Sequence, residues 1–197
     1  RAFECTSVVR LCEALVRIEV EDLPASADRD FSISWLRGAV ADLLEQLLAK
    51  REPETPVELG DRLMAIINVL LDDHQPDEEH ERQYGGTNMD PVTLRLNCVR
   101  GKAIDALLQL CLWRTRTKQE ALGACHHLHP DSVEAFERRL DPNVERSPAI
   151  HSFFGHRLSH LWWLSPDWVK EHLDAIFPSD SSRVEQWSAA IGGYVLY

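Results

Sequence analysis

Apolar residues recur at helical spacing along almost the whole chain. They stand three or four positions apart, which places them on one face of an α-helix. In the first half this pattern predicts helices over about 2–20, 32–51 and 57–73. Pro53 and Pro56 separate the last two, because proline cannot continue a helix interior. The stripes expected to face the core are Val8, Leu11, Cys12, Leu15 and Ile18, then Leu36, Val40, Leu43, Leu44, Leu47 and Leu48, then Leu59, Leu63, Ile66, Ile67 and Leu70.

The second half carries clear helix-start signals. Asparagine, aspartate and serine are favoured N-caps, and proline fits the first helical position. Asp131 with Glu134 resembles a capping box for a helix over about 132–140. No stretch of useful length alternates as a strand would, so the expected fold class is all-α. The remaining helices are expected to start near Asp90-Pro91, Asn97, Ser147-Pro148, Ser165-Pro166 and Arg183.

Residues 74–90 interrupt the helical pattern. The segment is acidic, lacks apolar periodicity and contains Gly85-Gly86, so we expect a flexible loop. It separates N-terminal helices over 1–73 from C-terminal helical repeats over 91–197. The helix from Asn97 has only a narrow polar strip, which indicates a helix covered on several sides, as in the stacked helical hairpins of an α-solenoid or TPR-like array. The strip is Lys102, Asp105, Gln109 and Arg116.

Composition narrows the classes of partner and the compartment. The formal net charge is −11 and no run of basic residues occurs, which argues against nucleic acid as a partner. No segment is long and apolar enough to span a membrane. The five scattered cysteines are interpreted as reduced thiols of a cytoplasmic protein. Both ends of the sequence interrupt helical patterns, so we expect a fragment that packs against the rest of a longer chain and self-associates when isolated.

Arg100 and Gly101 raise the question of a chemical site in the helix from Asn97. Arg100 lies in line with the apolar side of that helix, and a buried guanidinium needs a carboxylate or carbonyl partner. We therefore expect a structural ion pair that joins two helices, with a ligand-binding arginine as the alternative. The small residues Gly101, Ala103 and Ala106 indicate close helix packing. Gly101-Lys102 is not a phosphate-binding loop, since Ala103 replaces the required serine or threonine.

The histidines suggest two metal sites and one catalytic pair, none of them complete. Cysteine and histidine occur together in Cys125–His129, but the spacing matches no standard zinc module. His156 and His160 stand one helical turn apart and lack a third ligand. We therefore expect no metal, no cofactor and no catalytic residue. The alternative is an all-α enzyme, because Arg146 and His151 have the Arg-x4-His spacing of HEPN ribonucleases, although Pro148 opposes one helix through both.

Aromatic residues cluster in the last third of the chain. Their spacing and the leucines around them indicate core packing. A protein-binding face is the alternative, since exposed tryptophan and phenylalanine are common interface anchors. The residues concerned are Phe153, Phe154, Trp162, Trp163 and Trp168.

Three segments together resemble the C-terminal helical region of bacterial antiviral STAND NTPases of the Avs type. They are "DPVTLRLNCVRGKAIDALLQLCLW", "LDPNVERSPAIHSFFGHRLSHLWWLSPDWVKEHLDAIFP" and "WSAAIGGYVLY". The resemblance covers about 85–197 and departs from the family pattern at Cys98, Lys102 and Ile191-Gly192. It implies a sensor segment without chemistry of its own. Such a segment would bind a phage protein, such as a terminase or portal, and trigger a separate NTPase and effector.

Overall fold

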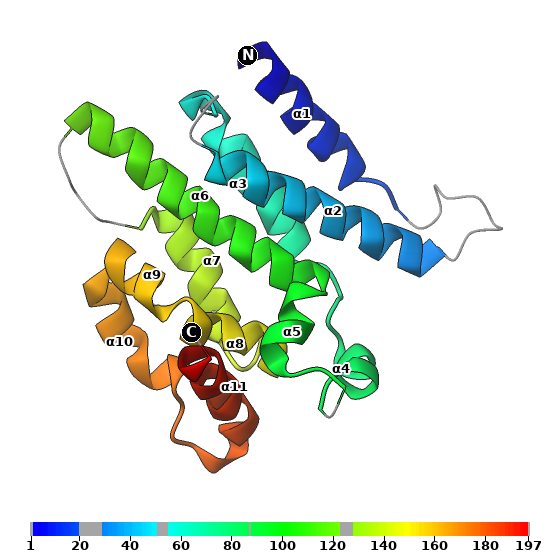
Figure 1. The fold of residues 1–197 in the computed structure, drawn as a ribbon, viewed down its shortest axis with the longest axis vertical. Helices are drawn as coiled ribbons and strands as arrows, with labels where there is room; N and C mark the ends of the chain where they lie inside the picture. Colours follow the sequence, from blue (N-terminus) through cyan, green and yellow to red (C-terminus); the bar gives the residue numbers. More distant parts are fainter. Residues whose placement is uncertain (1, 20–28, 51–54, 87, 123–127, 197) are drawn as a thin grey trace.

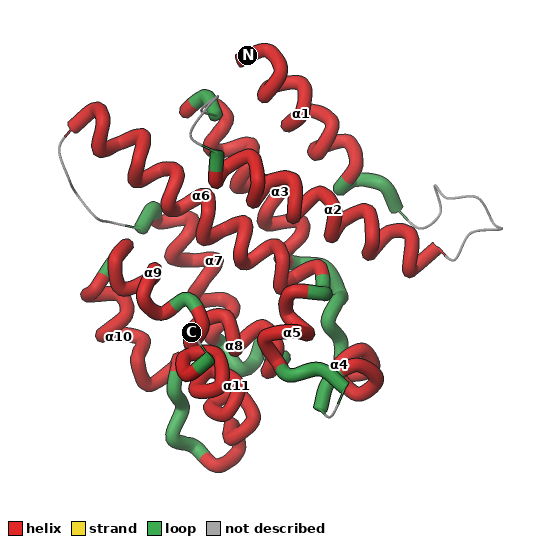
Figure 2. The backbone as a smooth tube through the Cα atoms, viewed as in Figure 1, coloured by secondary structure: helices red, strands yellow, loops and turns green. Residues whose placement is uncertain are grey.

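The structure is a computed structural model that describes residues 2–19, 29–50, 55–86, 88–122 and 128–196. All regular structure in these ranges is helical (Figure 2), which confirms the expected all-α class. Two 3-10 helices, η2 (Val57–Leu59) and η3 (Ser181–Arg183), precede the third and the last α-helix. The α-helices are α1 (Ala2–Leu15), α2 (Arg29–Ala49), α3 (Gly60–Leu71), α4 (Glu78–Tyr84), α5 (Pro91–Leu96), α6 (Val99–Leu122), α7 (Pro130–Leu140), α8 (Pro148–His156), α9 (Leu158–Leu164), α10 (Pro166–Ile176) and α11 (Val184–Val195).

Helix α6 lies at the centre of the molecule. It contacts α2 and α3 on one side and α5, α8 and α9 on the other, and Figure 1 shows it running between the blue and the yellow-orange helices. Its core-facing residues are fully buried, as expected for a helix covered on several sides. Among the described helices, none is long and apolar enough to cross a membrane.

The apolar stripe of α3 is confirmed, whereas the stripe of α1 is displaced. All five stripe residues of 57–73 are buried. In α1 the buried line is Cys5, Val9, Cys12 and Val16, and Leu11 is 54% exposed. The prediction for Leu11 was therefore wrong. The reason is that α1 turns the Cys5–Val16 line, which also has helical spacing, toward α2 and α3.

Several predicted helix ends need correction. Residues 74–90, expected to be a loop, contain α4, whose N-cap Asp77 accepts from the amide of His80. Asn97 does not cap α6, because its amide group donates to the carbonyl of Thr93 at 2.7 Å. The capping box is absent, since Asp131 pairs with Arg114 at 2.7 Å instead. Two serine caps are confirmed, at the starts of α8 and α10.

Helices α8 and α11 cross at very short range. A Cβ atom added to Gly155 would lie 1.8 Å from the carbonyl oxygen of Ala190. One added to Gly193 would lie 2.6 Å from the carbonyl oxygen of Ser152. Ala190 is fully buried in this crossing. The two glycines therefore allow backbone contact that any other residue would prevent.

Gly155→Ala should destabilise the protein by at least about 2 kcal/mol, because the added methyl group forces α8 and α11 apart. Gly192→Ala is the matched control, since a Cβ atom at Gly192 meets nothing within 4 Å. There alanine should be neutral or stabilising by up to about 1 kcal/mol, because it favours the helix. Urea unfolding followed by circular dichroism measures both. Equal effects of the two changes would contradict the close crossing.

Candidate functional site

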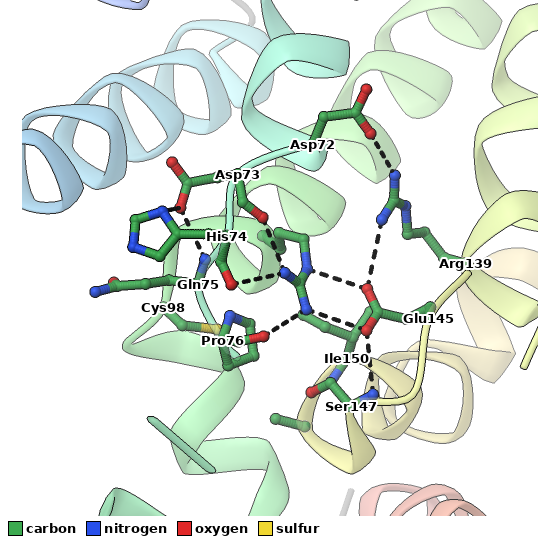
Figure 3. Close-up of polar contacts among 12 residues, drawn as sticks. Asp72, Asp73, His74, Gln75, Pro76, Cys98, Arg139, Glu145, Ser147 and Ile150 are labelled. Carbon is green, nitrogen blue, oxygen red and sulfur yellow. Dashed lines mark hydrogen bonds and ion pairs between the residues drawn. The ribbon is translucent and has the colours of Figure 1, made fainter. Parts of the chain in front are cut away.

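Arg100 holds the connection between α3 and α4. Its guanidinium donates to the carbonyl oxygens of Asp73 at 2.8 Å and His74 at 3.0 Å, and also to that of Pro76. Both carboxylate oxygens of Glu145 lie 3.1 Å from its nitrogens, one from Nη2 and the other from Nε. Figure 3 shows these acceptors converging from two chain segments. The Arg100 side chain is 13% exposed, and its donors face acceptors of the protein itself.

The acceptors of Arg100 lie in connecting segments, whereas a second helix was expected to supply them. The carboxylate belongs to the connection between α7 and α8, and the carbonyls belong to the turn before α4. Arg139 extends the contact, because its guanidinium lies 3.5 Å from Glu145 and 2.8 Å from Asp72 (Figure 3). Arg100 therefore joins α6 to two connecting segments rather than to a second helix. This arrangement positions the backbone that leads into α4.

Gly101 lies against α5 rather than against a distant helix. A Cβ atom at Gly101 would be 1.9 Å from the carbonyl oxygen of Arg95. Ala103 and Ala106 are fully buried on the same helix. Gly101 thus lets the last turn of α5 fold back onto the start of α6.

A second buried network lies where α5, α6 and α8 meet. Arg95 is completely buried and forms an ion pair with Asp105, which also accepts from Nε of Arg157 at 3.0 Å. Asp105 was expected on the polar strip of α6, and that prediction is wrong because these two guanidinium groups cover it. Nη2 of Arg95 lies 2.7 Å from Nδ1 of His156. Burial lowers the pKa of His156 to about 4, and the charge of Arg95 adds to this effect.

The five aromatic candidates do not form one surface. Phe153, Phe154 and Trp168 are buried and pack around Phe136, which is a core role. Trp162 and Trp163 remain 48% and 46% exposed on α9. The ammonium group of Lys170 lies 5.7 Å from the ring centre of Trp162. Of the five aromatic residues, only Trp162 and Trp163 remain candidates for contact with another protein.

The structure describes only part of the two candidate metal sites. Cys125, His126 and His127 lie outside the described residues. His156 ends α8, whereas His160 belongs to α9, since the chain turns at Arg157. Across the described ranges, no group of three or more His, Cys, Asp or Glu side chains is placed to hold a metal ion.

Arg146 and His151 do not share a helix. Arg146 is exposed and precedes the N-cap of α8. His151 is 3% exposed, and its Nε2 lies 2.8 Å from the carbonyl oxygen of Ile176. Its ring therefore faces α10 and the core. The geometry that an HEPN pair requires, with both side chains on one helix surface, is not found at these two residues.

A cleft of about 470 Å³ lies between α2, α4 and the α5–α6 corner. We call it the Trp35 cleft. Its floor is apolar, with Leu94, Cys98 and Val99 each at most 2% exposed. Trp35 is 68% exposed and Tyr84 is 40% exposed, so aromatic rings remain open to solvent at its walls. The lining residues are Ser34, Trp35, Gly38, Ala39, Asp42, Gln75, His80, Tyr84, Met89, Leu94, Asn97, Cys98, Val99 and Lys102.

Two residues that line the cleft each have a buried polar atom without a hydrogen-bond partner among the described residues. The atoms are Oγ of Ser34, whose residue is 8% exposed, and Nδ1 of His80. Burial lowers the pKa of His80, so its ring is neutral at pH 7. The charges in the cleft are paired, since Nζ of Lys102 lies 2.6 Å from Asp42. Both residues line the cleft, but the two atoms themselves are buried.

The cleft was not predicted from the sequence, although Trp35 gave one indication of it. Trp35 stands nine residues before Leu44, hence about 180° around α2 from that fully buried leucine. A tryptophan opposite the core stripe is a common interface anchor. The opposing wall carried no such indication, because His80 and Tyr84 fall in the segment expected to be a loop.

No family model, curated protein or solved structure matches this chain.

Arg100→Ala should cost about 3–5 kcal/mol of unfolding free energy, because it leaves the buried carboxylate of Glu145 without its closest partner. Arg138→Ala is the matched control. Its side chain is 53% exposed in the pair with Asp72, and its loss should cost less than about 1 kcal/mol. Arg100→Met combined with Glu145→Gln should recover part of the loss, since no buried charge is then left alone. Thermal and urea unfolding measure these changes. A negligible effect of Arg100→Ala would contradict a stabilising role for the contact between Arg100 and Glu145.

His151 should make the protein less stable as the pH falls. Burial lowers its pKa from 6.5 to about 4 in the folded chain. Between these values the unfolded chain binds a proton that the folded chain does not, so unfolding free energy decreases as pH falls from 6.5 toward 4. From pH 7 to pH 4.5, wild type should lose roughly 2 kcal/mol more than His151→Gln, which keeps a donor but does not titrate. Parallel losses in urea unfolding would show that His151 is accessible to protons when folded.

Proposed function

We propose that this chain recognises another protein, and that the Trp35 cleft is where it does so. The observation that carries the proposal is an apolar hollow with two exposed aromatic rings, Trp35 and Tyr84. Exposed tryptophan and tyrosine are enriched where proteins bind one another. A polypeptide segment with apolar side chains would supply the matching contact.

The Trp35 cleft is a better candidate than the tryptophan pair on α9. Trp162 and Trp163 lie on one exposed helix, and Lys170 already covers part of Trp162. The cleft is built by three separate elements, and two of them are held by the buried arginine networks. A preformed hollow loses less conformational freedom on binding than a surface that must reorganise.

The resemblance of residues 85–197 to Avs-type antiviral proteins supports a more specific version of the proposal. In it, the chain is a cytoplasmic sensor segment of a bacterial defence protein, without catalysis of its own. The partner is a phage terminase- or portal-like protein, and binding activates an NTPase and effector elsewhere in the longer chain. The segment would belong to an array of stacked helical hairpins. Contacts of α8 with α9 and of α9 with α10 support that arrangement.

The proposal is tested by measuring binding to purified terminase and portal proteins from a panel of tailed phages. Trp35→Ala should weaken binding at least about tenfold, because it removes an exposed aromatic anchor. Trp187→Ala is the matched control, since Trp187 is 43% exposed on α11 and does not line the cleft. It should change affinity less than about twofold. Surface plasmon resonance gives the affinities.

Each part of the proposal has its own contrary result. Loss of binding in Trp162→Ala but not in Trp35→Ala would move the contact to α9. Absence of binding to every terminase and portal protein would reject the phage-protein version of the proposal.

A further inference from the structure

Helix α4 is held to the rest of the molecule by few contacts. It buries no residue, and among the described α-helices it alone packs extensively against no other helix. In Figure 1 it lies at the edge of the fold. A helix of seven residues is also too short to be stable by itself in water. The position of α4 therefore depends on the few polar contacts that reach it.

One side chain of α4 makes hydrogen bonds to another helix. The carboxylate of Glu81 accepts from the hydroxyl group of Ser147 and from the backbone amide of Ala149 at 3.4 Å, at the start of α8. The other hydrogen bonds of α4 to described residues stay within the helix or the turns beside it, as between Arg82 and Glu79. Among the described residues, loss of the Glu81 contact would thus detach α4 from α8.

Hollows border α4 on two of its faces. His80 and Tyr84, one helical turn apart, face the Trp35 cleft. The face with Glu81 borders two more hollows, one of about 530 Å³ at the end of the helix and one of about 520 Å³ at its start. Little side-chain packing therefore surrounds α4. Segments with few buried apolar contacts open locally far more often than a core unfolds.

The two ends of α4 are held differently. Before the helix, Arg100 binds the carbonyl oxygens of residues 73, 74 and 76. After it come Gly85 and Gly86, and Gly86 has a φ of +67°, with nothing within 4 Å of an added Cβ atom. Glycine has the greatest backbone freedom of all residues. The end of α4 can therefore move while its start stays fixed.

Release of α4 would change the shape of the Trp35 cleft. Met89 and Leu94 line both the cleft and the hollow at the end of α4, so the two spaces meet there. The opposite wall and the floor would stay in place, because α2 and α5 pack against α6. Without α4 as a wall, the two hollows would form one groove along the apolar floor of the cleft.

We propose that α4 is a releasable strap that controls the width of the Trp35 cleft, and that the contact of Glu81 with Ser147 holds it closed. This inference rests on the proposed function and adds the regulation of the same site. In the closed state, α4 supplies His80 and Tyr84 as one wall of the cleft. In the open state, the floor becomes accessible to a larger segment of the partner protein.

Labelling of Cys98 can measure this movement, because Cys98 lies on the floor of the cleft. It is 1% exposed, and burial raises its pKa to about 12, with a further rise from the charge of Glu81. A buried thiol of this kind is inert until its cover opens. Cys111 is the internal control. It is 4% exposed, burial raises its pKa to about 12 as well, and it does not line the cleft.

The experiment treats the folded chain with N-ethylmaleimide and follows each cysteine by mass spectrometry of tryptic peptides. In the wild type, Cys98 should react at least about tenfold faster than Cys111, because local opening is more frequent than unfolding of the core. Glu81→Ala should speed the labelling of Cys98 at least about fivefold and leave Cys111 unchanged, since it removes the hydrogen bonds to α8.

Glu79→Ala is the matched control on the same helix. Glu79 is exposed and pairs with Arg82 of α4 itself, so its loss should change either rate less than about twofold. Equal rates at Cys98 and Cys111 in the wild type overturn the inference. So does an effect of Glu81→Ala that is absent or that Cys111 shares equally. The proposed function is decided separately, by whether Trp35→Ala weakens binding of an intact partner protein.

Discussion

The ion pair between Arg95 and Asp105 is the contact on which the described architecture depends most. Arg95 is completely buried, so its charge would be strongly destabilising without a carboxylate nearby. Asp105 of α6 forms the ion pair with Arg95. Its carboxylate also accepts a hydrogen bond from Arg157, which lies in the turn between α8 and α9. One carboxylate thus determines how α5 folds back on α6 and where the C-terminal helices attach. Gly101 makes this corner possible, since its missing side chain leaves space for the backbone of Arg95.

The floor and one wall of the Trp35 cleft follow from this corner and from Arg100. Leu94 stands next to Arg95 in α5, so the buried ion pair also fixes the apolar floor. Arg100 holds the carbonyls of residues 73, 74 and 76, which lead directly into α4. Helix α4 itself buries no residue and so has little apolar packing to hold it. Its position, and therefore that of His80 and Tyr84, depends on polar contacts, through Arg100 before the helix and through Glu81, in its middle, with Ser147.

The sequence predicted local structure well and three-dimensional neighbours poorly, and single residues show why. The serine caps at Ser147 and Ser165 were predictable because a cap depends only on the next three residues. Asp105 was misplaced because a helical wheel gives the angle of a side chain and not what covers it. Helix α4 was missed because its sequence, EEHERQY, has no apolar stripe to reveal a helix. The cleft is formed by α2, α4 and the α5–α6 corner together, so it could not be inferred from any one of these segments.

Pairing inside the molecule also determines the charge that a partner meets. Arg37, Arg95, Arg100 and Arg139 have side chains at most 14% exposed, and each pairs with at least one carboxylate. Each pair removes one charge of either sign from the exterior and leaves the formal net charge of −11 unchanged. The arginines that a nucleic-acid-binding surface would need are thus partly used in the interior. The same networks that build the cleft therefore also keep arginine side chains away from the exterior.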